Sequence, residues 1–517
     1  MESQKSNFLK YQLPVILWAI IILTVSSIPQ LAGIKTQWTK YDKIAHFIEY
    51  AIFGFLLTLI LARNLNQSDF GKFTYITSLV NIFLIIADMG ISSLLLREVS
   101  RQRELTIEIF PKLFSIKLPL VILAFISFVV MLIFSPAVDT KQTAVILAVA
   151  YLLVSISTFI SVLFKAHEKM HLLLIGDFIY KALLITACWF VLRSRKDLHS
   201  IVLVYLVAGI IVLLFYLISS CKYFRYGRVL VGIKEFVYNF FTHIKMSVPL
   251  ALGGIIMVIY INTDVVVLKW MKGESVTGLY GISYGFYLGI TIIASLLVQS
   301  LFPRLSYALE KSQKEVVGMI LSGSIKLLTL ISVPLALGGV LLSSKLILFF
   351  YGERYIDSNS AFQIFMFAMI INFFNTLFSY YLFAARKQGV VNKIFFVSVS
   401  LNIILNLILI PKYSLNGAAF ATLLAELLFF LLFLFLYPDF ILYFRIQWII
   451  YGLLSVSVLS LFLLAVRNIL PLIPVVLSGM AIYIMILIVT GIVKEEKELL
   501  QMIFKGKMQS EQKNITG

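Results

Sequence analysis

The sequence predicts an all-α protein that crosses a membrane many times. Of its 517 residues, 61% are hydrophobic and only 13% are charged, about half the charged fraction of an ordinary globular chain. The mean hydropathy is +0.99. Apolar runs of about 20 residues recur along the chain, and each is long enough to cross the hydrocarbon core as a helix.

Fifteen segments have the length and composition of a membrane helix. They lie at residues 12–29, 44–62, 73–95, 113–135, 142–164, 171–192, 199–220, 246–268, 278–301, 319–342, 361–384, 391–411, 416–436, 446–466 and 470–493. The first follows basic residues, as a signal peptide would. No A-x-A-like cleavage site follows it, so we retain it as a membrane segment.

An internal repeat divides these helices into two halves. A shift of 207 positions places "QSDFGKF" over "ESVTGLY", so that Gly71 falls on Gly278 and Arg97 on Arg304. Farther on, "FKAHEKM" resembles "FAARKQG" at a shift of 219. The order is the same in both halves, as in transporters built from duplicated bundles.

The repeat predicts two pseudo-symmetric six-helix lobes with additions at both ends, about 14–15 membrane helices in all. The predicted parts are an N-terminal segment at 1–62 whose second helix opens the N-lobe, the rest of the N-lobe at 63–220, a basic linker at 221–245, a C-lobe at 246–436, two appended helices within 437–493, and a tail at 494–517. The linker is the longest polar connection, so no room remains for a soluble catalytic domain. We therefore expect a protein that is not an enzyme.

Membrane orientation explains the net charge of +18 without a nucleic-acid partner. Starting from the loop at 96–112, every second connection and the C-terminal tail carry more Lys and Arg than the alternate connections, which begin at 63–72. Positive residues collect on the cytoplasmic side of a cell membrane and near anionic lipid. The C-terminus is therefore predicted to be cytoplasmic.

Two kinds of chemistry are not indicated. Cys188 and Cys221 lie far apart in or beside spans, so neither a disulfide framework nor a metal site is predicted. No Walker loop GxxxxGK[ST] occurs, so ATP hydrolysis is not expected. No cofactor is predicted, and energy would come from a Na⁺ or H⁺ gradient, the membrane potential or downhill use of the product.

From Arg63 onward, a series of stretches resembles the Wzx-type flippases of the multidrug/oligosaccharidyl-lipid/polysaccharide exporter superfamily. The series is "ARNLNQSDFGKF", "IADMGISSLLLREVSR", "VPLALGGIIMVIYINTDVVVLKWMKGESVTGLYGISY", "QSLFPRLSYAL", "YGERYIDSNSAF" and "LNIILNLILIPKYSLNGAAFATLLAE", in the family's order. The resemblance implies a MATE-like flippase that moves undecaprenyl-diphosphate-linked oligosaccharide by alternating access. It also implies membrane lipids, a polysaccharide polymerase and glycosyltransferases as partners.

The opening stretch does not follow that family. "SSIPQ" followed by "DKIAHFIEYAIFGFLL" resembles the start of VanZ-like membrane proteins, and its helix would replace the flippase's first helix. Asp42, His46, Glu49 and Tyr50 share one face of this helix by their spacing. They would either form a proton or metal site or anchor the helix end among lipid headgroups, and we favour anchoring.

Ionisable residues inside apolar spans are the best pointers to function, because each costs on the order of 3 kcal/mol at a helix centre. Asp264 lies beside Asn262 and Thr263, and a carboxylate with neutral oxygens nearby can bind Na⁺ or take a proton. The alternative is an aspartate facing water at the outer helix end. Asp88 is a second coupling candidate, or a packing hydrogen bond between helices.

Four basic residues are candidates for binding a diphosphate: Arg63, Arg97, Lys181 and Arg304. Arg97 and Arg304 are repeat mates on the predicted cytoplasmic side, where ordinary anchoring explains them equally well. Lys181 has an alternative partner in Asp177, four residues earlier on the same helix.

The remaining intramembrane polar candidates are Glu426, Asn372, Asn375, Asn402 and Asn406. No partner for Glu426 is evident from the sequence. The asparagines could recognise sugar, although hydrogen bonding between helices is their commoner use.

The leading hypothesis is thus a lipid-linked oligosaccharide flippase. A cation-coupled multidrug exporter of the same superfamily is the alternative. A membrane glycan polymerase or glycosyltransferase is the remote alternative, because such enzymes generally need a larger extramembrane loop than this chain offers.

Overall fold

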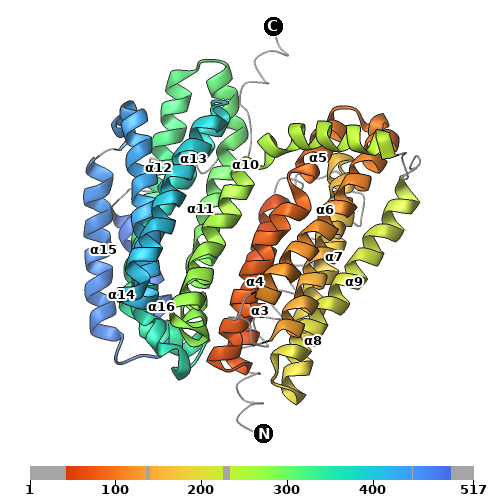
Figure 1. Cartoon of the computed structure of the whole chain (residues 1–517). Helices are drawn as coiled ribbons and strands as arrows, with labels where there is room; N and C mark the ends of the chain where they lie inside the picture. The colour runs from red at the N-terminus through yellow and green to blue at the C-terminus, as the bar shows by residue number, and fades with distance from the viewer. Residues whose placement is uncertain (1–41, 135–139, 225–232, 445, 491–517) are drawn as a thin grey trace. The chain divides into compact units, whose positions relative to one another are not determined.

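The computed structural model describes residues 42–134, 140–224, 233–444 and 446–490, and these form helices joined by short turns, with no strand among them (Figure 1). The chain divides after Gly278 into two compact units. The predicted segment at 12–29 lies outside the described residues.

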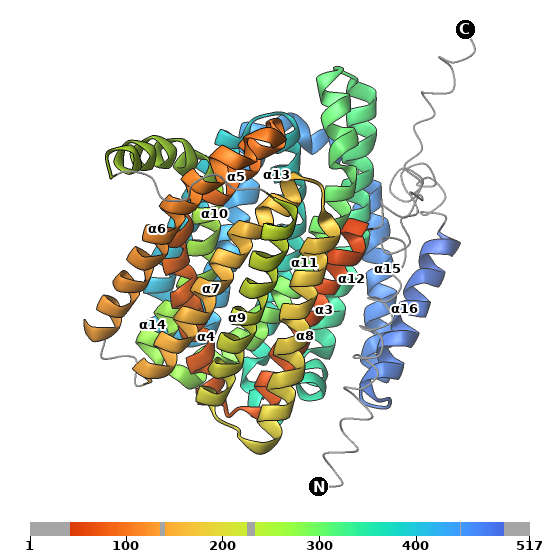
Figure 2. The same ribbon diagram turned by 90° about the vertical axis from the view of Figure 1, so that its right-hand side faces the viewer.

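Unit 1 is a bundle of long helices. Its elements are α3 (Asp42–Asn64), α4 (Gln67–Asp88), α5 (Ile91–Arg101), the short η3 (Arg103–Leu105), α6 (Thr106–Phe134), α7 (Lys141–Ala166), α8 (Met170–Ser194), α9 (Leu198–Tyr223), α10 (Ile233–Lys272) and the first turn of α11 (Glu274–Glu310). Helix α7 packs along α9 and against α4 and α5, while α8 packs between α9 and α3 (Figure 2). One core cluster includes Leu113, Ile116, Phe159, Phe164 and Tyr216.

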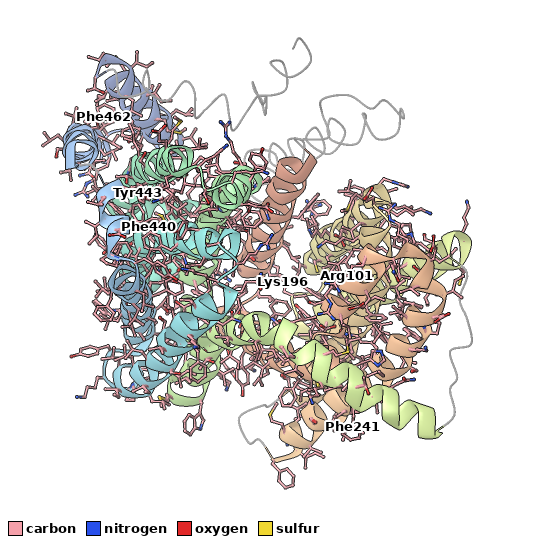
Figure 3. The ribbon with its side chains drawn as sticks, turned by 90° about the horizontal axis from the view of Figure 1, so that it is seen from above. Arg101, Lys196, Phe241, Phe440, Tyr443 and Phe462 are labelled. Atoms are coloured by element: carbon pink, nitrogen blue, oxygen red, sulfur yellow. The ribbon has the colours of Figure 1, made fainter. Side chains whose placement is uncertain are left out.

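The first part of α10 crosses one end of unit 1, where it contacts α5 (Figures 1 and 3). Phe241 on this part is 69% exposed, whereas Asn239 is buried. The helix begins at Ile233, so the second part of the predicted linker 221–245 is helical.

Unit 2 is a second helical bundle. Beyond the rest of α11, its elements are α12 (Lys314–Phe350), η4 (Glu353–Ser358), α13 (Asn359–Ala384), α14 (Gln388–Leu436), η5 (Pro438–Tyr443), α15 (Ile446–Val466) and α16 (Leu472–Val489). Helix α13 packs against both α12 and α14, and the pair α15 and α16 packs against α12. Leu459, Leu463 and Val475 of that pair form a core with Leu342 of α12.

Eleven helices in the described part of the chain are long and apolar enough to cross a membrane. Two shorter apolar helices, Phe53–Asn64 and Ser455–Val466, are the described apolar parts of α3 and α15. Large apolar side chains such as Ile122, Ile126 and Phe190 are exposed on the bundle surface, as lipid-facing residues are. The predicted all-α polytopic membrane fold is confirmed.

The predicted span at 73–95 is wrong at both ends. Asn66 caps α4 by accepting a hydrogen bond from the backbone N–H of Asp69 at 2.7 Å, so this helix begins earlier. It ends at Asp88, because Met89 and Gly90 have left-handed backbones with φ of 40° and 83°. The apolar residues after the break belong to the buried face of α5, and a hydropathy average merges them with α4.

Helix α14 joins the two predicted spans 391–411 and 416–436 around a bend. The bend is at Ser414, whose φ of 54° and ψ of −135° are not helical. Pro411 lacks the N–H that a continuing helix needs. A Cβ at Gly417 would lie 2.5 Å from the carbonyl oxygen of Leu409, so only glycine fits this turn without a shift of the backbone.

Candidate functional site

The break after α4 is a junction of several helices in unit 1. The hydroxyl of Ser247, on α10, donates to the carbonyl oxygen of Met89 at 2.9 Å. A Cβ at Gly90 would lie 2.4 Å from the backbone oxygen of Ser247. The absence of a side chain at Gly90 therefore lets α10 approach the break, and the left-handed backbone lets the chain turn from α4 into α5.

An ion pair between a buried lysine and a partly exposed aspartate lies beside this break. The ammonium of Lys117, on α6, donates to Oδ1 of Asp88 at 2.9 Å and to the hydroxyl of Ser155, on α7, at 3.0 Å. Ser92, on α5, donates to the same carboxylate oxygen at 2.5 Å. The side chain of Lys117 is 1% exposed and that of Asp88 is 36% exposed. The pair joins α4, α5, α6 and α7 and neutralises a lysine inside an apolar bundle.

Sequence reasoning missed Lys117 and also Lys326, which is 1% exposed on α12 in unit 2. Both occur in the tetrapeptide SIKL, at residues 115–118 and 324–327, a shift of 209 positions. A search of the two halves for identical tetrapeptides that place a lysine in an apolar span would have found them. The two lysines are thus repeat mates, and each half of the chain carries one at a buried position.

Asp264 lies on α10 and is 1% exposed, so it does not face water as the alternative prediction required. Asn262 donates to the carbonyl oxygen of Val258 at 2.7 Å, and Asn81 of α4 approaches its side-chain oxygen at 3.5 Å. Thr263 donates to the carbonyl oxygen of Ile259 at 2.6 Å. Both neighbours of Asp264 thus make hydrogen bonds within their own helix.

Glu426 is the centre of a polar cluster in unit 2. Its Oε1 accepts hydrogen bonds from the hydroxyl of Tyr287 and the amide of Asn372, each at 3.0 Å. The amide of Asn375 donates to Oε2 at 2.7 Å and to the backbone oxygen of Glu426 at 2.9 Å. The carboxylate is 6% exposed, and these donors come from α11 and α13. The structure thus brings together three predicted candidates.

Asn402 and Asn406 form a hydrogen-bonded pair of side-chain amides on α14. The amide of Asn406 donates to the side-chain oxygen of Asn402 at 3.1 Å, and both residues are fully buried. This hydrogen bond links two successive turns of one helix.

Three of the predicted diphosphate-binding residues lie in unit 1 and the fourth lies in unit 2. Arg63 lies in the last turn of α3 and Lys181 in the middle of α8, and both are half-buried in unit 1. Arg97 on α5 pairs with its neighbour Glu98 at 2.7 Å. Its repeat mate Arg304 is half-buried on α11 in unit 2.

Asp177, the predicted alternative partner of Lys181, accepts a hydrogen bond from the hydroxyl of Tyr216 at 3.4 Å. The same hydroxyl lies 3.0 Å from the carbonyl oxygen of Leu173. This links α8 to α9. The side chains of Asp42, His46, Glu49 and Tyr50 on α3 lie outside the described residues.

Gly71 and Gly278, which the repeat aligns, lie at a tight helix contact in unit 1. A Cβ at Gly278 would lie 3.3 Å from the backbone N of Gly71 and 2.5 Å from the oxygen of Gln67. The carboxylate of Glu274 lies beside this contact. It accepts a hydrogen bond from the hydroxyl of Ser68 at 2.8 Å and lies 3.6 Å from the ammonium of Lys72 and 3.0 Å from that of Lys269. These polar groups belong to α4, α10 and the start of α11.

Two turns also follow the repeat, at a shift of 218 rather than 219. Glu168 and Arg386 have left-handed φ of 58° and 59°. In each turn the next residue donates from its backbone N–H to a carbonyl five positions back, Lys169 to Phe164 and Lys387 to Leu382, at 2.8 Å. Among the described residues, no group of three or more His, Cys, Asp or Glu is arranged to hold a metal ion.

Two family models match this chain. One, described as polysaccharide biosynthesis protein, matches residues 44–309, and MatE matches residues 249–408. The first match includes most of α3.

Curated relatives give partial matches. The chain is 24% identical over 389 residues to a probable low-salt glycan biosynthesis flippase of Haloferax volcanii, covering 72% of this chain and 78% of that protein. It is 25% identical over 220 residues to a probable lipid II flippase of Helicobacter pylori. That match covers 41% of this chain and 46% of the relative, so it spans less than half the relative's length.

Two solved structures share the fold. The lipid II flippase MurJ in an inward closed conformation has a TM-score of 0.65 at 16% identity, covering 87% of this chain and 97% of that one. An inward-facing multidrug resistance MATE family transporter of the MOP superfamily has a TM-score of 0.57 at 14% identity, covering 82% and 98%. At these identities the likeness is one of fold alone.

Proposed function

The chain belongs to the polysaccharide biosynthesis protein family, and from this premise we propose that it is a Wzx-type flippase. The cargo is an undecaprenyl-diphosphate-linked oligosaccharide repeat unit, moved across the cytoplasmic membrane for a surface polysaccharide. The observation that carries the proposal is the similarity to a glycan biosynthesis flippase over 72% of this chain.

In this proposal the two repeat halves alternate access to the two sides of the membrane. The diphosphate is attracted by Arg63, Arg97, Lys181 or Arg304, because guanidinium and ammonium groups bind phosphate oxygens well. A polysaccharide polymerase and glycosyltransferases would act on the same lipid-linked unit, and the C-terminus lies in the cytoplasm.

Coupling to Na⁺ or H⁺ is assigned to Asp264 in the same proposal. A carboxylate that is 1% exposed within an apolar span needs a cation, a proton or a basic group to compensate its charge. Asp88 is the second candidate, since its side chain is 36% exposed although Lys117 pairs with it. Proton or cation binding at either residue would change the local charge during the cycle.

The experiment is depletion of the protein in its host, followed by measurement of which leaflet holds the lipid-linked oligosaccharide. Access of a membrane-impermeant oxidant to the glycan reports the outer leaflet. We expect depletion to trap the glycan on the inner leaflet, and wild-type protein to restore access. Unchanged access, with no second transporter present, would contradict the proposal.

Asp264→Asn tests the coupling part separately. It should express normally but move less glycan under a Na⁺ or H⁺ gradient, whereas Asp439→Asn, an exposed carboxylate on η5, should behave as wild type. Full activity of Asp264→Asn with unaltered ion dependence would remove Asp264 from the proposal and leave the flippase assignment intact.

A cation-coupled multidrug exporter is the second candidate, because the MatE family model matches residues 249–408. It predicts gradient-driven efflux of cationic dyes from cells that overproduce the protein. We expect no such efflux; dye export with unaffected glycan access would favour this candidate.

A further inference from the structure

An apolar groove runs between α8 and α9 on the surface of unit 1. Its volume is about 420 Å³, and its walls include Leu183, Ala187 and Val191 of α8 and Leu203, Val207 and Ile211 of α9. The three α9 residues are 41%, 55% and 37% exposed. The groove thus opens on the outside of the bundle, where lipid tails lie against a membrane protein.

The groove has the length of one leaflet. From Leu183 to Ser194 it follows α8 for eleven residues, which corresponds to about 17 Å at 1.5 Å per residue. Half of a hydrocarbon core is about 15 Å thick. An acyl chain lying along the groove would therefore reach from the bilayer midplane to the headgroup layer.

Polar groups gather at one end of the groove only. Ser194, Arg195 and Ser200 line that end, where α8 stops and α9 begins. The guanidinium of Arg193 lies 3.8 Å from the centre of the Trp189 ring. Tryptophan and arginine in this arrangement are typical of a helix end at the membrane interface.

The turn between the two helices is basic. Residues 193–199 contain Arg193, Arg195, Lys196 and His199 against a single carboxylate, Asp197. Burial by itself would raise the pKa of Asp197, but hydrogen bonds from Ser200 and the charges of Arg195 and His199 hold it below its ordinary value. Asp197 is therefore an anion at neutral pH that caps α9 and leaves the turn with excess positive charge.

This positive charge lies on the side of the membrane that the positive-inside rule predicts to be poor in basic residues. The turn is at the end of unit 1 opposite α5 and the first part of α10 (Figure 1). The distribution of Lys and Arg among the connections predicts that α5 and the linker are cytoplasmic, which puts the α8–α9 turn outside. Short outer connections normally carry few basic residues, so three of them within four positions need another reason.

We propose that the α8–α9 groove binds an anionic phospholipid of the outer leaflet. One acyl chain lies along the groove, and the phosphate is held at its polar end by Arg195, with Lys196 adding charge. Arginine suits this role because its planar fork can make two hydrogen bonds to one phosphate. The site is on the lipid-facing side of unit 1 and does not depend on what the protein transports.

The test uses the full-length protein, purified and delipidated, with phosphatidylglycerol and phosphatidylcholine as probes. Native mass spectrometry counts the retained lipid, and thermal unfolding records its stabilising effect. We expect phosphatidylglycerol to bind and phosphatidylcholine to bind much more weakly. The double variant Arg195→Gln/Lys196→Gln should bind phosphatidylglycerol about 30-fold more weakly, since each basic residue at the surface contributes on the order of fivefold.

Matched variants separate the groove from general surface charge. Lys412→Gln removes an exposed lysine on α14 that does not line the groove, and it should change nothing. Ala187→Phe should fill the groove and weaken lipid retention, whereas Thr186→Phe, which does not line it, should not. Arg195→Lys should retain partial binding, which distinguishes loss of phosphate recognition from misfolding.

Three results would overturn the proposal. One is equal retention of both lipids, and another is unchanged phosphatidylglycerol binding in both the charge variant and Ala187→Phe. The third is displacement of phosphatidylglycerol by equimolar undecaprenyl diphosphate, which would assign the groove to an isoprenoid diphosphate lipid. The first two results do not bear on the flippase proposal, whose readout is glycan access in cells. The third would place a lipid of the proposed cargo's kind in the groove.

Discussion

The ammonium nitrogen of Lys117 lies 2.9 Å from Oδ1 of Asp88, and the two residues are exposed very unequally. Lys117 is enclosed by apolar residues of α6 and α7, including Phe159, whose ring centre lies 5.8 Å from the ammonium. Asp88 reaches the surface of its bundle beside the α4 break. The charge of Lys117 is therefore compensated mainly by Asp88, whereas the charge of Asp88 can also be solvated by water.

This inequality predicts unequal effects of neutralising the two residues. Asp88→Asn strands a buried ammonium and should lower the free energy of unfolding by about 3 kcal/mol or more. Lys117→Met leaves a carboxylate that water can reach, so it should cost less. The double variant should be more stable than Asp88→Asn alone. Thermal unfolding in one detergent mixture measures all three, and equal losses in the two single variants would contradict the argument.

Removal of one donor should weaken the Glu426 cluster. Tyr287→Phe deletes the hydroxyl that donates to Oε1 and should destabilise the protein by about 1.5–3 kcal/mol, the usual contribution of a hydrogen bond to a charged group. In the background of Glu426→Gln the same change should have a smaller effect, because the accepting charge is already gone. Additive losses in this double-mutant cycle would show that the two groups do not interact.

The contact between Gly71 and Gly278 should not tolerate a methyl group. A Cβ at Gly71 would lie 1.9 Å from the backbone oxygen of Glu274, so the helices must move apart. Gly71→Ala and Gly278→Ala should each lower stability by about 1–3 kcal/mol or more. Gly285→Ala is the control, since a Cβ there meets no atom within 4 Å. Thermal unfolding of the three variants should rank the control closest to wild type.

His167 should make the protein sensitive to acid. Partial burial, and then the charges of Arg103 and Lys169, hold its pKa below the ordinary value of 6.5. The unfolded chain then binds more protons than the folded one, so stability is complete above pH 6.5 and falls as the pH drops through the folded pKa. His167→Gln should reduce the loss of stability between pH 7.5 and 5.

The control for this experiment is His199→Gln, which changes an exposed histidine at the start of α9. It should follow the acid response of the wild type. Identical pH profiles for wild type and His167→Gln would show that this histidine does not contribute.

Truncation should separate α3 from what precedes it. Helix α3 packs against α8, with the rings of Phe53 and Phe178 6.3 Å apart. A chain that starts after Gln37 should keep glycan transport, whereas one that starts at Arg63 should lose folding or activity. Fluorescence-detected size exclusion followed by the glycan-access assay distinguishes the two. A fully active chain from Arg63 would make α3 dispensable.

Local features of the sequence determined the membrane helices. Hydropathy depends on neighbouring residues only, so most predicted spans agree with observed helices to within a few residues, and 446–466 agrees with α15 at both ends. The repeat also aligned Gly71 with Gly278, and the structure shows that these two glycines lie at one tight helix contact. The resemblance to a flippase family rested on the order of short stretches and agrees with the family match.

Only the tertiary structure decided which polar groups meet. Lys117 and its partner Asp88 are 29 residues apart on different helices, and a single lysine in an apolar run carries no local sign of its partner. The donors to Glu426 come from two other helices for the same reason. The break at Met89 and Gly90 was missed because hydropathy measures composition and not backbone angle, and the close packing of Ser247 against Gly90 exists only once α10 has docked. Polar pairing inside a membrane bundle is set by which helix faces pack together, and that is a property of the folded chain.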